Sequence, residues 1–333
     1  MLKLFQSIFS GGRETGRYPE TLIEAAIERA VDATDPRLRA ISGYRKRLRD
    51  PVLNAMDHAV ALVDNLPEAL PADNSTYASD ARLSALFASP ERMRDMFGSD
   101  SALGGFRDRQ GDDGARITAL LLAERVEKNV MGVELSGEML RRDVPQVAVS
   151  FRGHRLVDPA GSEVETRRQL KRRAFDHLLS LALLRMTEVR EERADLNRQR
   201  DLLRRKLRAL AHGGWEFEAP GDSDPSALQA ELDAIEMQLL ELGTDDRALV
   251  PRLDIAARML ADPGQQFWAD TVHLNLDRMN IRRGERDASA RAVDLHELHN
   301  ARGHRFVILL LAIAPGDLPP RVDFLDAAQR HLV

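Results

Sequence analysis

Apolar residues recur at alternating spacings of four and three along residues 163–211, the pattern of a coiled-coil seam on one long helix. Nine of the eleven seam positions are apolar. They are Phe175, Leu179, Ala182, Met186, Val189, Arg193, Leu196, Arg200, Leu203, Leu207 and Leu210. Residues 225–262 repeat the stepping, beginning with Leu228, Leu232, Ile235, Leu239 and Leu242. We therefore expect an antiparallel coiled-coil hairpin over 163–262.

The charges of the two arms favour pairing with each other. The first arm carries 14 Lys or Arg against 8 acids, and the second carries 3 Arg against 8 acids. Opposite charges beside an apolar seam favour this partner and disfavour pairing of two basic arms. Neutralisation by the neighbouring arm is the expected role of the arginines, with nucleic-acid binding or intermolecular pairing as alternatives.

Residues 18–97 show helical periodicity in short segments. We predict helices over 19–31, 36–48 and 51–63, and two shorter ones near 79–87 and 90–97. Residues 66–77 have the composition of a loop, and 98–114, rich in Gly, Asp and Ser, that of a linker. The expected result is a helical domain over 18–97.

The segments on either side of the hairpin have strand character. Alternating patterns predict strands near 147–151, 155–157, 272–276, 293–297 and 306–313, with a turn at Arg152-Gly153. Residues 117–135 fit either a strand pair turning at 127–129 or a helix. Because neither half makes a stable sheet alone, we expect an α+β fold. Its mainly antiparallel sheet is built from 115–160 and 265–315, the hairpin interrupts it, and a tail follows over 316–333.

Composition narrows the classes of protein. The chain has no cysteine, which excludes disulfides, Cys-zinc sites, iron–sulfur clusters and thiol chemistry. Its 48 basic residues are nearly all Arg, but the net charge of −5 argues against a general polyanion binder. The longest apolar run, 306–314, is about half of a membrane span. We expect a cytoplasmic protein with no membrane span.

The sequence contains no motif of a catalytic or cofactor site. It lacks a P-loop, a dinucleotide-binding glycine pattern, a GxSxG elbow and an HExxH pair. His296 and His299 would lie on opposite faces of a strand, so we expect no metal site there. An enzyme is the less favoured class, and its site would have to lie in an interdomain cleft formed by residues distant in sequence.

Two groups of residues are candidate binding sites. Trp215 and Phe217 lie in the segment joining the arms, where they either anchor a protein partner or fold back to cap the coiled coil. The second group is a basic strip with no acid from 36 to 49, which either contacts phosphates or is a solvated or paired helix face. Its members are Arg37, Arg39, Arg45, Lys46, Arg47 and Arg49.

The favoured function is a non-enzymatic scaffold or adaptor that uses the hairpin to bind a protein partner or to oligomerise, without a cofactor. One alternative is a nucleic-acid-associated protein that binds phosphates through its basic helices. The other is the enzyme with a cleft site.

Overall fold

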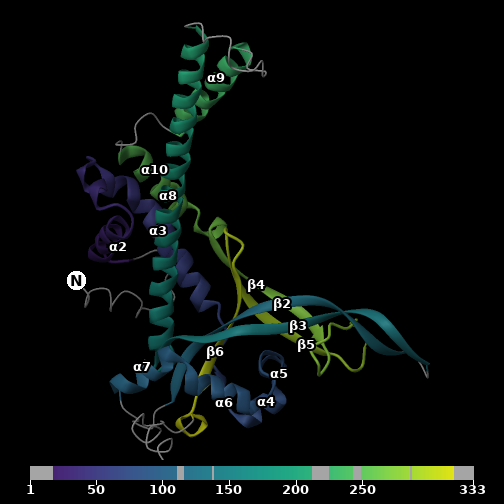
Figure 1. The fold of residues 1–333 in the computed structure, drawn as a ribbon. Helices are drawn as coiled ribbons and strands as arrows, with labels where there is room; N and C mark the ends of the chain where they lie inside the picture. Colours follow the sequence, from purple (N-terminus) through teal and green to yellow (C-terminus); the bar gives the residue numbers. More distant parts are fainter. Residues whose placement is uncertain are drawn as a thin grey trace, which may run out of the picture. The chain divides into compact units, whose positions relative to one another are not determined.

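The structure is a computed structural model, and Figure 1 shows its fold. It describes residues 18–110, 116–136, 139–211, 225–242, 249–285 and 287–318.

The described residues form two compact units. Unit 1 contains residues 18–57 and Phe175–Pro263, and unit 2 contains His58–Ala174 and residues 264–318. Residues 18–97, expected to form one helical domain, contribute to both units.

Unit 1 is built from helices. They are α2 (Glu20–Ala33), the 3-10 helix η1 (Pro36–Ala40), the first part of α3 (Tyr44–Asp64), most of α8 (Glu163–Ala211), α9 (Pro225–Glu241) and α10 (Leu249–Ala261). The apolar residues of α2 recur at spacings of three and four and form its buried face. They are Leu22, Ile23, Ala26, Ile27, Ala30 and Val31, and all six are buried.

The helices predicted over 36–48 and 51–63 differ from those observed. Residues 36–40 form only the turn of η1, and Gly43, at φ +78°, separates it from α3. Helix α3 then continues through Pro51. Pro51 was expected to begin a separate helix, but Leu48 and Val52 are buried on both sides of it, and packing of this face keeps one continuous helix through it.

The coiled-coil hairpin is confirmed. Helix α8 is continuous for 49 residues, about 70 Å at 1.5 Å per residue. Helix α9 lies along its distal part (Figure 1), and Leu203, Leu232 and Ile235 form a buried cluster between them. The flanking seam residues Leu196, Leu207, Leu228 and Leu239 pack against this cluster.

Unit 2 contains a sheet with the strand order β3-β2-β6-β5-β4. The strands are β2 (Ile117–Ser136), β3 (Met139–Ala160), β4 (Phe267–Leu276), β5 (Arg291–Asn300) and β6 (Arg305–Ile313). Neighbours along this order are antiparallel, and the two-residue β1 (Leu70–Pro71) adds a parallel partner to β6. Strands from both sides of the hairpin thus share one sheet, as expected, and the fold is α+β.

Strands β2 and β3 are longer than predicted. The expected turns at 127–129 and at Arg152-Gly153 are absent, because the two strands pair with each other through both positions. Gly153, at φ +64°, instead lies where the register shifts between Leu122 and Glu124. The glycine therefore marks a bulge, which bends a strand without ending it.

The two faces of the sheet have different cores. The larger core combines odd-numbered residues of β2 and β6, such as Leu121 and Leu309, with Phe97 and Phe106 from the helices. The smaller one joins Ile308 and Leu310 of β6 to Leu120, Leu170 and Val63. Strand β6 is apolar on both faces because both are covered.

Four short helices contribute to the larger core. They are α4 (Asn74–Ser79), α5 (Ala81–Leu86), α6 (Pro90–Ser99) and α7 (Ser101–Gln110). The linker predicted over 98–114 is wrong for α7. The Asp100 side chain accepts a hydrogen bond from Leu103 N at 2.9 Å and caps this helix, and burial of Leu103 and Phe106 outweighs the low helix propensity of its two glycines.

The segment 280–283 forms hydrogen bonds with both outer strands of the sheet, β3 and β4. Arg282 N donates to Val147 O at 2.8 Å and Val149 N donates to Asn280 O at 2.9 Å, on the free edge of β3. The same segment is bonded to the end of β4, where Arg283 N donates to Asn275 O at 2.8 Å. At this end of the sheet, the segment 280–283 therefore occupies the edges of both strands.

Candidate functional site

The α8–α9 pair carries large apolar side chains that are exposed, one of which, Leu210, is the last predicted seam position of α8. Leu202 and Leu210 of α8 are 53% and 45% exposed, and Met237 and Leu240 of α9 are 63% and 65% exposed. Seam residues on the same helices are nearly all covered. Exposed apolar residues that cluster on one element mark a candidate protein-binding surface.

The charges along this pair are segregated by helix. Residues 190–211 of α8 contain eight basic and four acidic side chains, whereas 225–242 contains four acids and no base. One interhelical ion pair joins them in the described structure, from Arg204 Nη2 to Glu236 Oε1 at 2.6 Å. This pair agrees with the expected neutralisation within the hairpin, yet Arg205, Lys206 and Glu231 remain exposed.

Trp215 and Phe217, the proposed partner anchors, lie outside the described residues. Their role stays a prediction.

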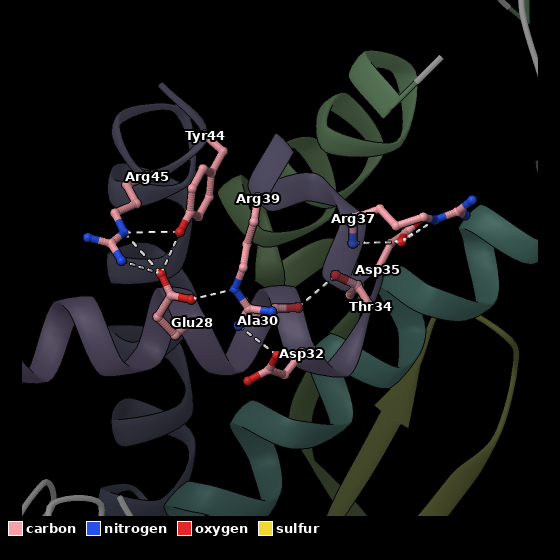
Figure 2. A network of polar contacts seen from close by, with 9 residues as sticks. All are labelled: Glu28, Ala30, Asp32, Thr34, Asp35, Arg37, Arg39, Tyr44 and Arg45. Atoms are coloured by element: carbon pink, nitrogen blue, oxygen red, sulfur yellow. Dashed lines mark hydrogen bonds and ion pairs between the residues drawn. The ribbon is translucent and has the colours of Figure 1, made fainter. Parts of the chain in front are cut away.

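The arginines of the basic strip form ion pairs with carboxylates of neighbouring elements. Figure 2 shows the hub at Glu28 of α2, which accepts hydrogen bonds from Tyr44 Oη at 2.6 Å, Arg39 Nε at 2.9 Å and Arg45 Nε at 3.0 Å. Arg39 also pairs with Asp32 at 2.6 Å. Burial raises the pKa of Glu28, but the hydrogen bonds from Tyr44, Arg39 and Arg45 outweigh it and leave the pKa below its ordinary value.

A second hub lies at Asp35, the N-cap residue of η1. Its carboxylate accepts hydrogen bonds from Arg37 N at 3.1 Å, Arg37 Nε at 3.0 Å and Arg252 Nη1 at 2.5 Å. The Asp35 side chain is only 9% exposed. The Arg37 bonds, with that from Arg252, overcome the effect of burial and lower its pKa from 3.8 to about 2.

The remaining arginines of the strip also pair with carboxylates, and Lys46 is the exception. Arg47 pairs with Asp254 of α10, and Arg49 pairs with Glu20 of α2. For Lys46 the described residues provide no carboxylate within 4 Å. All five arginines thus have acidic partners, which reduces the positive charge that the strip offers to a phosphate; polyanion binding here stays a prediction.

Replacing Glu28 with alanine tests both roles of the strip. The variant removes the Glu28 carboxylate that Arg39 and Arg45 both bond to. We therefore expect the free energy of unfolding to fall by about 1–2 kcal/mol. The variant also uncovers positive charge. If the strip binds phosphates, Glu28→Ala should increase retention on DNA in low salt, and Glu28→Ala/Arg39→Ala/Arg45→Ala should not. Equal retention by wild type and both variants would remove the strip as a polyanion site.

Sequence reasoning missed a buried charged cluster on the sheet of unit 2. Arg125 of β2 and Glu297 of β5 have side chains 9% and 2% exposed, and Arg125 Nε donates to Glu297 Oε1 at 2.5 Å. Arg125 also pairs with Glu127. His299 Nε2 lies 3.8 Å from Glu297 Oε2, and the His299 ring stacks on Trp268 with centroids 5.5 Å apart.

This cluster has the properties of a structural network. Glu297 raises the pKa of Arg125 through their hydrogen bond, against the effect of burial. The charges of the pair therefore satisfy each other. The only sequence signal was the position of Glu297. The alternation along β5 places it on the same face as Leu295, and this face is expected to be buried.

The described residues contain no group of three His, Cys, Asp or Glu side chains arranged to hold a metal ion. Within the same part of the chain, every helix is too short or too polar to cross a membrane. Comparison of the chain with protein-family models, with curated proteins and with solved structures found no match.

Proposed function

We propose that the protein is a non-enzymatic scaffold that assembles through its α8–α9 hairpin, with a second copy of the same hairpin as the partner. The observation that carries this proposal is the exposure of Leu202, Met237 and Leu240, and of Leu210 at the end of the seam, on a pair of helices that already buries Leu203, Leu232 and Ile235 between them. A second copy of the hairpin would cover these side chains.

The charge distribution supports a second copy as the partner. We infer a two-fold arrangement in which α8 of each copy faces α9 of the other, so that each contact is made twice. The basic residues of 190–211 then lie near the acidic residues of 225–242 of the partner copy. Two-fold pairing therefore places opposite charges around an apolar centre, the arrangement that fixes register and partner in coiled coils.

The test is the mass in solution of Met237→Glu/Leu240→Glu compared with wild type. Across a hundredfold range of concentration, light scattering should show the wild-type mass rising from the 37.3 kDa of one chain toward twice that value. The double variant should stay at 37.3 kDa because it places two carboxylates in the proposed interface. High salt should weaken the wild-type association, since the flanking pairs are screened.

Val164→Glu/Val250→Glu is the matched control. Val164, in the first turn of α8, and Val250, in α10, are 74% and 45% exposed, and neither lies in the part of α8 that packs against α9. The control adds the same charge and should associate like wild type. A wild-type chain that stays at the mass of one copy, or equal loss in both double variants, would contradict assembly through this surface.

The segment joining the arms provides a separate test of partner capture. If Trp215 and Phe217 anchor a different protein, Trp215→Ala/Phe217→Ala should lose that protein in a pull-down while its own association is unchanged. If they cap the coiled coil, the same variant should lower the thermal stability of the hairpin.

A further inference from the structure

Unit 2 contains a cavity of about 700 Å³, within the size range of small-molecule sites. Three segments distant in sequence line it: residues 77–88, strand β3 at 149–151, and the loop between β4 and β5. Its lining is mixed, and the apolar part comes from side chains such as Tyr77, Phe87, Phe151 and Met279.

The walls of the cavity are held by internal hydrogen bonds. Leu86 O faces His154 Nε2 at 2.8 Å, and the ring of His154 stacks on Phe87 with centroids 4.8 Å apart. Tyr77 Oη donates to Phe87 O at 3.0 Å, and Asn280 Nδ2 donates to Ala85 O at 2.8 Å. These carbonyls are already bonded within the protein, so they are not the groups that select a ligand.

Two arginines are the charged groups of the lining. Arg278 follows β4 and Arg291 begins β5. The described residues place no carboxylate within 4 Å of either guanidinium, in contrast to the arginines of the basic strip. Arg291 Nη1 donates to the uncharged Ser84 Oγ at 3.0 Å. The cavity is therefore lined by two guanidinium groups that form no ion pair with a carboxylate of the described residues.

The position of Arg278 is fixed by a tight turn. Asp277 Oδ1 accepts hydrogen bonds from Met279 N at 2.8 Å and Ile281 N at 3.0 Å. Asp277 Oδ2 accepts one from Arg283 Nε at 2.9 Å. The carboxylate of this turn is thus directed to the backbone and to Arg283, and it holds the turn that carries Arg278 by hydrogen bonds within the protein.

The electrostatics of Tyr77 agree with this geometry. Burial raises the pKa of the Tyr77 phenol above its ordinary value, and the positive charge of Arg291 opposes that rise. The charge of Arg291 therefore acts on the aromatic wall of the cavity.

We propose that this cavity binds a small amphipathic anion, an aromatic or other apolar body that bears one carboxylate, sulfonate or phosphate group. The apolar body packs between Tyr77, Phe87 and Met279, and Arg278 and Arg291 donate to the oxyanion.

The test compares two dyes of nearly the same shape, anilinonaphthalene sulfonate and its uncharged analogue N-phenylnaphthylamine, by fluorescence titration of the full chain. Arg278→Ala/Arg291→Ala should weaken binding of the sulfonate about tenfold or more and leave the uncharged dye unchanged. Ala88→Phe, at an exposed position of the lining, should weaken both dyes because it fills the cavity.

Arg92→Ala/Arg94→Ala of α6 is the matched control, since it removes the same charge from two residues of unit 2 that do not line the cavity; it should bind both dyes like wild type. Sulfonate binding unaffected by Ala88→Phe would overturn the cavity as the site. Equal weakening by the two arginine pairs, or weakening by Ala88→Phe alone, would overturn the assignment of an anionic ligand. Circular dichroism of each variant confirms that it is folded.

Discussion

Replacing Glu297 with alanine is expected to lower the free energy of unfolding of unit 2 by about 3–5 kcal/mol. The side chain is 2% exposed and pairs with Arg125, which is 9% exposed. Its removal leaves a guanidinium buried beside the apolar core with one partner, Glu127, in place of two. The cost of an underpaired buried charge exceeds that of losing an ordinary hydrogen bond.

The fluorescence of Trp268 provides a local readout, since its ring stacks on His299 beside the pair. The chain has two tryptophans, so Trp215→Phe as a background leaves Trp268 as the only reporter. Urea unfolding followed at this residue should show the lower midpoint for Glu297→Ala.

Two further variants show whether charge is the cause. Asp294→Ala lies on the same strand with a side chain 64% exposed and should change the stability by less than about 0.5 kcal/mol. Arg125→Leu/Glu297→Leu removes both charges and should be less destabilised than Glu297→Ala alone. If the double leucine variant is the least stable of the three, packing volume and not the ion pair dominates.

Replacing Asp35 with asparagine should remove about 2 kcal/mol of stability at neutral pH and almost none near pH 2. Asparagine retains the capping of η1 but not the charge that pairs with Arg37 and Arg252. The predicted effect is therefore that of the ion pairs.

The direction of the pH dependence follows from the lowered pKa of Asp35. The folded protein keeps this carboxyl ionised down to about pH 2, whereas the unfolded chain protonates it near its ordinary 3.8. The stabilisation is complete above the unfolded value and is lost as the pH falls toward 2.

Urea unfolding by circular dichroism at a series of pH values measures this difference between wild type and Asp35→Asn. Other carboxyl groups titrate in both proteins and cancel. A difference that stays constant from pH 7 to pH 2 would show that the Asp35 charge does not stabilise unit 1.

The sequence predicted the coiled-coil hairpin because its signal is local and periodic. A seam such as Leu196, Leu203 and Leu207 repeats along one helix, and the matching spacing of Leu228, Leu232 and Ile235 identifies the partner. The strands after the hairpin have the same kind of signal, the alternation of Val272 and Leu274 or of Val293 and Leu295.

The errors arose where a local signal competed with packing over long distances in sequence. Pro51 and Gly153 are signals for the end of a helix or a strand, yet burial of Leu48 and Val52, and pairing of β3 along its full length, override them. The glycines of 101–110 had the composition of a linker, but Leu103 and Phe106 pack into the core and keep the segment helical.

The cavity has no sequence signal of its own, and the only signal of the buried ion pair is the position of Glu297 on the apolar face of β5. Arg278 and Arg291 are two of 43 arginines, and what distinguishes them is their place in the lining of the cavity, beside residues 77–88 that lie 190 or more positions earlier in the sequence. The basic strip is the opposite case: its residues stand out in the sequence, but partners such as Glu28 and Asp254 lie in other elements.

The position of the hairpin between the two groups of strands has a consequence for the growing chain on the ribosome. Strands β2 and β3 are synthesised long before β6, the strand that pairs with β2 in the middle of the sheet. Roughly 150 residues separate the end of β3 from the end of β6. At about 5–20 residues per second, translation of that stretch takes roughly 8–30 s. Each nascent chain therefore passes through a stage in which β2 and β3 expose an apolar face and an unpaired edge, and molecular chaperones bind such surfaces.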